Sequence, residues 1–128
     1  MERLKGKQME VTINNLEAYL AKTYGGFTEK NGVPLAENNL FMKLVEEMGE
    51  VAEVINKKTG RKADNGTDLQ AELGKELTDV IHYAVAIAAV NGIDLNKIII
   101  EKDRAAAIKY NHKINLETFI SESEKRDV

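Results

Sequence analysis

Prolines and glycines, the residues that most often interrupt helices, are placed so that long uninterrupted segments remain. The chain has a single proline, Pro34, and most of its nine glycines lie between segments with helical periodicity. Segments without such breakers favour helices. Within them, apolar residues recur every three or four positions, which is the spacing of one helical face. We therefore predict an all-α fold: a bundle of about four helices per chain, completed by oligomerisation.

The expected helices are bounded by capping residues and glycines, and cover about 13–24, 40–58, 68–90 and 95–110. Their expected N-caps, side chains that accept hydrogen bonds from the first helical turn, are Thr12 or Asn14, Asn38 or Asn39, Thr67 and Asp94. The segment 25–37 is long for a connection, which is typical of a functional loop. Residues 111–128 form a polar tail with at most a short amphipathic turn around Leu116, Phe119 and Ile120. We predict a single domain over residues 1–128, with its core at about 12–110.

Every residue from Ala84 to Val90 is apolar. A helix that is apolar all round is buried on all sides, and a domain of 128 residues offers few helices as cover. A partner subunit is the expected source, so we predict a homodimer or homotetramer.

Composition excludes several classes of protein. The chain has no cysteine and a net charge of −3, so thiolate metal sites are excluded and the basic footprint of a nucleic-acid binder is missing. It has no apolar segment of membrane-spanning length and no signal-peptide pattern at Met1–Glu10. We expect a cytoplasmic protein that binds neither membrane nor nucleic acid polymer.

Two matched acidic pairs are the most informative motif. Glu47 and Glu50 are three residues apart on the second expected helix, and Glu76 and Asp79 are three apart on the third. We place the apolar stripes at Leu44 and Met48 and at Leu77 and Ala84. At roughly 100° per residue, the first acid of each pair lies about 100° to one side of its stripe and the second about 60° further. A short connection makes the helices antiparallel, so the four carboxylates are expected to converge at the border of the core.

Four converging carboxylates repel one another unless a cation offsets their charge. Hard divalent cations prefer oxygen ligands, and Mg²⁺ takes a few carboxylates together with water and phosphate oxygens. With only His82 and His112 and no cysteine, a zinc site is not expected. We predict Mg²⁺, with Mn²⁺ as a substitute. Single acids on helices are ordinarily solvated surface, and we assign Glu46 and Glu53 to that class by their outward angle.

Both motifs resemble one family. Residues 44–53, Leu-Val-Glu-Glu-Met-Gly-Glu-Val-Ala-Glu, are similar to the EExxE block of the MazG-like all-α nucleoside triphosphate pyrophosphohydrolases. Residues 76–83, Glu-Leu-Thr-Asp-Val-Ile-His-Tyr, resemble the family's ExxD block with the tyrosine of its dCTP-cleaving branch. Gly-Ile-Asp-Leu at 92–95 resembles the turn that follows. The similarity covers about residues 39–110.

The resemblance implies that Glu47, Glu50, Glu76 and Asp79 bind Mg²⁺. It also implies that a nucleoside triphosphate is cleaved between its α- and β-phosphates to a monophosphate and pyrophosphate. We assign catalytic roles to Glu46, which would orient the attacking water, and to Glu47.

The resemblance further assigns the phosphates to Lys102 and Lys109 and the base to Asn39 and Tyr83. The chain has Ala106 where the family has an asparagine, and Lys109 where it has an arginine. It also lacks the tryptophan that holds the base in some relatives. Each residue also has a purely structural interpretation. The two lysines would be solvated surface residues, Asn39 would cap a helix, and Tyr83 would be an aromatic residue at the edge of the core.

Two other functions remain open. One is that of phosphoribosyl-ATP pyrophosphatase, which has a similar arrangement of acidic residues on its helices. A non-catalytic helical interaction module would use the acids as a partner surface, and it would show little stabilisation by Mg²⁺.

Overall fold

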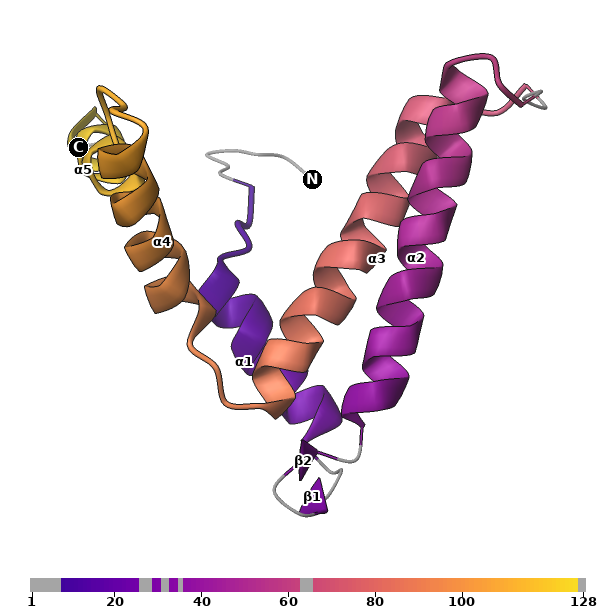
Figure 1. Ribbon diagram of the computed structural model, residues 1–128, viewed down its shortest axis with the longest axis horizontal. Coiled ribbons are helices and arrows are strands. Elements are labelled where there is room, and N and C mark those ends of the chain that lie inside the picture. The colour runs from indigo at the N-terminus through magenta and orange to yellow at the C-terminus, as the bar shows by residue number, and fades with distance from the viewer. Residues whose placement is uncertain (1–7, 26–28, 31–32, 35, 63–65, 127–128) are drawn as a thin grey trace. The chain divides into compact units, whose positions relative to one another are not determined.

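The computed structural model describes residues 8–25, 29–30, 33–34, 36–62 and 66–126. Within these ranges the regular secondary structure is helical, apart from two strands of two residues each that pair antiparallel. In chain order the elements are α1 (Ile13–Tyr24), β1 (Glu29–Lys30), β2 (Val33–Pro34), α2 (Glu37–Lys58), α3 (Leu69–Val90), α4 (Leu95–Lys109) and α5 (Leu116–Arg126) (Figure 1). The predicted all-α class is confirmed. The strands lie in the expected loop at 25–37, whose residues 26–28, 31–32 and 35 lie outside the described ranges.

Residue contacts divide the chain into two compact units, residues 1–93 and 94–128. The first contains α1, the two strands, α2 and α3, and the second contains α4 and α5. In the ranges that the structure covers, no single helix is both long and apolar enough to cross a membrane, although α3 and α4 reach that length and composition when taken together as a bent pair.

Several predicted helix ends are confirmed. At α1, the Thr12 hydroxyl accepts a hydrogen bond from the Asn15 backbone at 3.0 Å, and the Asn15 side chain accepts one from Thr12 at 2.9 Å. At α4, the Asp94 carboxylate accepts a hydrogen bond from the Lys97 backbone at 3.1 Å. Gly92 follows α3 with a φ of 67°, a left-handed conformation that glycine adopts without steric cost.

Two predicted caps are wrong. α2 begins at Glu37, earlier than expected, and its N-cap is Ala36, which makes no side-chain hydrogen bond. Asn38 and Asn39 therefore lie in the first turn of α2 and do not cap it. α3 is capped by Asp68 and not by Thr67, because the Asp68 carboxylate accepts a hydrogen bond from the first turn at 3.1 Å.

α2 and α3 lie side by side and run in opposite directions (Figure 1). On each helix, the residues with low exposure to solvent follow one another at alternating intervals of four and three residues and so form one face. We call these the inner faces. They consist of Leu40, Leu44, Glu47, Val51 and Val54 on α2, and Leu69, Leu73, Glu76, Val80, Tyr83 and Ile87 on α3. Glu47 and Glu76 therefore belong to the faces that pack together, and the prediction that they flank the packed stripe is wrong.

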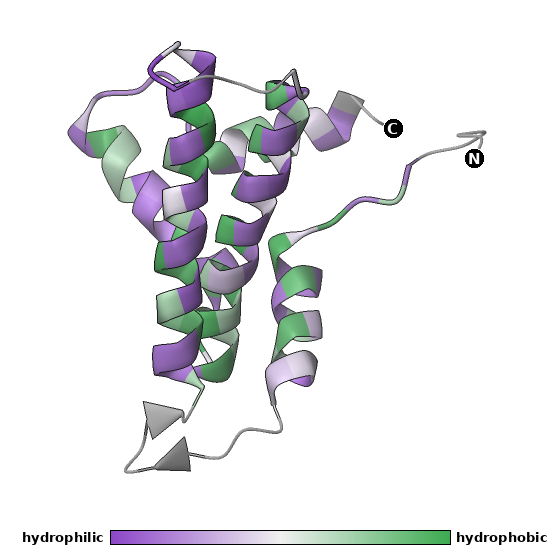
Figure 2. Ribbon diagram, turned by 90° about the vertical axis from the view of Figure 1, so that its right-hand side faces the viewer, coloured by the Kyte–Doolittle hydropathy of each residue, from purple (hydrophilic) through white to green (hydrophobic). Residues whose placement is uncertain are grey.

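The error in the predicted stripe has a clear cause. Each helix carries a second apolar row, one residue further along and therefore rotated by roughly 100°, which remains largely exposed. We call these rows the outer apolar face: Phe41, Val45, Met48 and Ile55 on α2, and Leu77 and Ile81 on α3. The colours of Figure 2 show hydrophobic and hydrophilic residues alternating along both helices. Because the two rows are adjacent, the sequence pattern merges them into one wide stripe whose centre is displaced.

The apolar run from Ala84 to Val90 is largely covered within the chain. Val85, Ala86 and Ala88 are buried, and α1 packs against α3. This run is therefore less exposed than the outer apolar face, whose side chains are 44–55% exposed.

The polar tail contains a helix longer than the short turn expected. α5 has 11 residues. At its N-terminus, the backbone N–H of Leu116 donates a hydrogen bond of 2.7 Å to the carboxylate of Asp103 in α4. Arg104 donates two hydrogen bonds of 2.9 Å to the Glu117 carboxylate. These contacts between distant residues are not visible in a periodicity pattern.

Candidate functional site

Three of the predicted metal ligands come together between α2 and α3. One carboxylate oxygen each from Glu47, Glu76 and Asp79 lies within 4.8 Å of the others. Glu47 comes from α2, and Glu76 and Asp79 are one turn apart on α3. A divalent cation with oxygen ligands fits this donor set, because it would replace three mutual repulsions with attractions. We call these residues the acidic cluster.

Glu50 and Glu46 lie beside the acidic cluster on α2. Glu50 is exposed and is one helical turn beyond Glu47. It is on the same side of the helix pair as Asp79, since both are three residues beyond an inner-face glutamate. Glu46 has a side chain that is 63% exposed and accepts a hydrogen bond of 3.2 Å from Lys43. Within the described ranges, neither carboxylate joins the three that converge within 4.8 Å.

The electrostatics of the acidic cluster are those of crowded acids. The pKa of Glu47 is raised above its usual value of 4.5 by partial burial, by the charges of Asp79 and Glu76 and by a hydrogen bond with Glu76. Each of these causes disfavours the ionised form, and the charge of Lys43 acts more weakly in the opposite direction. A cation bound at the same place would act in the opposite direction and favour ionisation.

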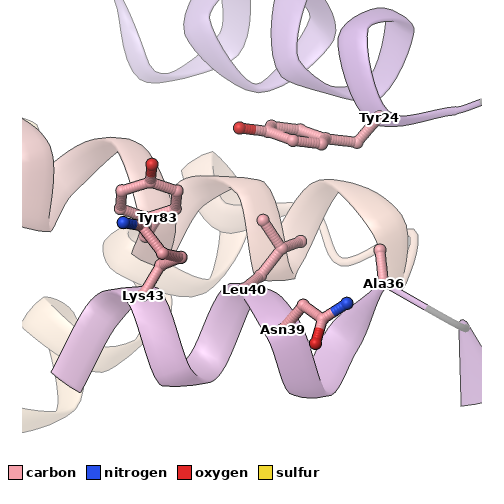
Figure 3. A pocket seen from close by; sticks show the side chains of 6 residues that line it. All are labelled: Tyr24, Ala36, Asn39, Leu40, Lys43 and Tyr83. Carbon is pink, nitrogen blue, oxygen red and sulfur yellow. The ribbon is translucent and has the colours of Figure 1, made fainter. Parts of the chain in front are cut away.

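A pocket of about 220 Å³ lies at the N-terminal end of α2, and both residues predicted to bind the base line it. Tyr24 of α1 faces the α2 residues Asn39, Leu40 and Lys43, and Tyr83 of α3 stands at one end (Figure 3). The aromatic rings and Leu40 provide apolar surface. The Asn39 amide and the Lys43 ammonium provide polar groups. This mixture suits a flat heterocycle with polar edges.

His82 joins the two tyrosines of the pocket. Its Nε2 shares a hydrogen bond of 2.8 Å with the Tyr24 hydroxyl. Its ring packs edge-on against Tyr24 and Tyr83, at centroid distances of 5.9 Å and 4.8 Å. The sequence motifs did not single out Tyr24, His82 or Lys43. The spacing of Lys43 from Glu47, four residues on one helix, was the available signal for the lysine.

The two lysines predicted to bind phosphate belong to the second unit. Lys102 and Lys109 are exposed residues of α4, and the Lys109 ammonium lies 5.3 Å from the centre of the Tyr110 ring. The acidic cluster and the pocket are built entirely by the first unit.

Comparison with known proteins supports the resemblance. Residues 36–115 match the model of the MazG nucleotide pyrophosphohydrolase domain. The chain belongs to this family. The matched segment includes α2, α3 and α4, and therefore the acidic cluster. Membership supports a hydrolase that acts on nucleotides, and it agrees with a metal site built from carboxylates.

The chain is also similar to YpjD of Bacillus subtilis (strain 168), described as an uncharacterized protein. The two are 29% identical over 85 residues, which cover 66% of this chain and 72% of YpjD.

Proposed function

We propose that this MazG domain hydrolyses nucleoside or deoxynucleoside triphosphates between the α- and β-phosphates, in a reaction that depends on Mg²⁺. The observation that carries the proposal is the arrangement of the acidic cluster. Three carboxylates from two antiparallel helices meet within 4.8 Å. The same two helices also contribute residues to the lining of the pocket.

The proposed ligands are Glu47, Glu50, Glu76 and Asp79. Glu50 joins the set because it lies one turn beyond Glu47 on the side of the helix pair that Asp79 occupies, so a change of side-chain rotamer would bring its carboxylate toward the other three. Bound Mg²⁺ would neutralise phosphate charge and lower the pKa of an attacking water. Glu46 is proposed to orient that water and Glu47 to hold the metal. Mn²⁺ would substitute, because it also accepts carboxylate and water oxygens.

Substrate binding is proposed to use the residues that the family resemblance assigns to it. Asn39 and Tyr83 would hold the base in the pocket. Lys102 and Lys109 of α4 would contact the triphosphate, since the carboxylates already offset much of the metal's charge. The match to the family runs from the first unit into the second, which supports a single functional domain. Lys102→Met and Lys109→Met should each lower kcat/KM by about ten- to hundredfold, and two variants within twofold of the parent would remove both lysines from the site.

We further propose that the active form is a homodimer or homotetramer. The two rows of the outer apolar face lie on the same side of the helix pair, because both are displaced by one residue in the same direction on antiparallel helices. Phe41, Met48 and Ile81 are each more than half exposed, at 53%, 55% and 51%. An apolar surface of this kind marks an interaction site.

The decisive experiment is a panel of ribo- and deoxyribonucleoside triphosphates together with phosphoribosyl-ATP, incubated with the protein and Mg²⁺ and assayed for pyrophosphate and nucleoside monophosphate. We expect both products in equal amounts, and loss of both when EDTA is added. Release of inorganic phosphate without pyrophosphate would overturn the cleavage position. Turnover of phosphoribosyl-ATP alone would select that alternative, and no turnover together with no stabilisation by Mg²⁺ would select the interaction module.

A further inference from the structure

Lys43 occupies the place between the pocket and the acidic cluster. Asn39, Lys43 and Glu47 follow one another on α2 at intervals of four residues, so their side chains share one side of the helix. Each interval advances about 6 Å along the helix axis. Asn39 and Lys43 line the pocket, and Glu47 belongs to the acidic cluster.

α3 repeats this order from the opposite direction. Tyr83 lines the pocket, and Asp79 and Glu76 lie one and two turns away from it in the acidic cluster. A molecule that reaches from the pocket to the acidic cluster must therefore pass Lys43. Among the described residues that line the pocket, Lys43 alone carries a positive charge.

We propose that the Lys43 ammonium binds the α-phosphate of the nucleotide, and that this phosphate replaces Glu46 as its partner. The inference rests on the proposed function, because it needs a base in the pocket and phosphates at the acidic cluster. One sugar separates the base from the α-phosphate, and this span is comparable to the rise from Asn39 to Lys43.

The exchange of partners is physically easy. The Lys43 side chain is 47% exposed and its bond to Glu46 measures 3.2 Å, and exposed ion pairs contribute little to stability. A phosphate presents more negative charge and more acceptor oxygens than one carboxylate. When the Lys43 ammonium moves to the phosphate, the Glu46 carboxylate is released next to the acidic cluster, where it is proposed to orient water. The α-phosphate remains on the monophosphate product, so Lys43 should contribute to the binding of substrate and product alike.

Calorimetric titration tests this directly. The four common deoxynucleoside 5′-monophosphates and their parent nucleosides would be titrated into the full chain in Mg²⁺, for the parent protein, Lys43→Met and Lys43→Arg. We expect Lys43→Met to weaken the binding of the best monophosphate by roughly ten- to hundredfold. The affinity for the parent nucleoside should stay within twofold. Lys43→Arg should restore most of the monophosphate affinity, because it keeps the charge.

Lys62→Met is the matched control. Lys62 is also an exposed lysine paired with a glutamate, Glu53, at 3.8 Å, but it lies beyond the far end of α2. An equal loss in Lys62→Met would show a general effect of charge and overturn the proposal. So would monophosphate affinity within twofold in Lys43→Met, an equal loss of nucleoside affinity, or no monophosphate binding to the parent.

The triphosphate panel separates this inference from the proposed function. If triphosphates are hydrolysed but Lys43→Met binds monophosphates normally, only the role of Lys43 fails. If no triphosphate is hydrolysed but Lys43→Met selectively loses monophosphate binding, the proposed reaction fails and the phosphate contact stands.

Discussion

Glu47 is the residue at which packing and chemistry conflict. It lies in the inner face of α2, between Leu44 and Val51, at a position where an apolar side chain would pack against α3. Asp79 and Glu76 raise its pKa further. A carboxylate in this position is stabilised by a proton at low pH or by a cation at neutral pH, and the second case is the one that serves catalysis.

The raised pKa sets the direction of a pH effect. Because folded Glu47 holds its proton more tightly than unfolded Glu47, its favourable contribution is fully present below the ordinary pKa of 4.5. This contribution is lost as pH rises through the raised pKa of the folded state. In EDTA, Glu47→Gln should therefore have a higher Tm than the parent near pH 7, and the difference should shrink toward pH 4. A difference that is constant with pH would contradict the assigned cause.

Loss of any one proposed ligand should stop turnover without unfolding the protein. We expect Glu47→Gln, Glu50→Gln, Glu76→Gln and Asp79→Asn each to lower kcat/KM by roughly a hundredfold or more, as does the loss of other electrostatic groups that act on the transition state. Each should also lose most of the rise in Tm that Mg²⁺ produces. Glu53→Gln, an exposed acid on the same helix, is the control. Near-normal activity in two of the four variants would contradict the proposal that these residues share a metal site.

Sequence reasoning located the residues of the acidic cluster but not their surroundings. The two i, i+3 pairs on antiparallel helices indicated that the acids meet, and Glu47, Glu76 and Asp79 do so, although the predicted apolar stripe was misplaced and Glu50 does not join them within 4.8 Å. The same reasoning could not find the contact between Tyr24 and His82. These residues are 58 positions apart, and the contact depends on how α1 packs against α3.

At the level of elements, a polar contact between Tyr24 and His82 connects α1 to the site. The Tyr24–His82 hydrogen bond is partly buried and joins α1 to α3. Burial also raises the pKa of Tyr24, with smaller contributions from Tyr83 and Tyr19. The bond therefore holds one wall of the pocket in place and contributes to stability.

Tyr24→Phe keeps the aromatic wall and removes the hydroxyl. We expect it to lower the free energy of unfolding by about 0.5–1.5 kcal/mol, the usual net contribution of one hydrogen bond. Urea titration followed by circular dichroism would measure the change. Tyr19→Phe is a matched control, since Tyr19 is 65% exposed on the same helix. Equal stabilities for the two variants would show that the bond does not hold α1.

Helix positions were predictable where local signals decide them and less so elsewhere. α1 and α4 begin at caps that the sequence identified, Thr12 and Asp94. α2 begins without a capping side chain, so no local signal marks its first residue. α5 depends on Asp103 and Arg104 of the preceding helix, and its own sequence is too polar to reveal it.

At the scale of the whole molecule, the helix pair has two sides with different chemistry. One side carries Glu50 and Asp79, and the opposite side carries the outer apolar face. We propose that a second copy covers the apolar side, because this would remove its apolar surface from water. The sequence alone predicted an oligomer from the run at 84–90, but the exposed surface is elsewhere, because α1 already packs against α3.

A charge placed in the outer apolar face should therefore prevent assembly. We expect the parent to sediment as an oligomer at micromolar concentration and Ile81→Lys or Met48→Lys to shift toward monomer. Met42→Lys should not shift, because Met42 is equally exposed, at 58%, but projects from another part of α2. A folded monomeric parent would contradict the proposed assembly.

The offset of one residue between acids and outer apolar rows also limits how this domain can vary during evolution. An insertion or deletion of one residue within α2 or α3 would rotate everything beyond it by roughly 100°. Apolar side chains would then enter the proposed metal site, or carboxylates would enter the surface proposed to meet a second copy. Length differences among homologues should therefore be confined to the connections at 25–36 and 59–68. A homologue with an insertion of one or two residues inside either helix should have lost both its activity and its mode of assembly, whereas an insertion of seven residues, about two full turns, would keep the faces in place.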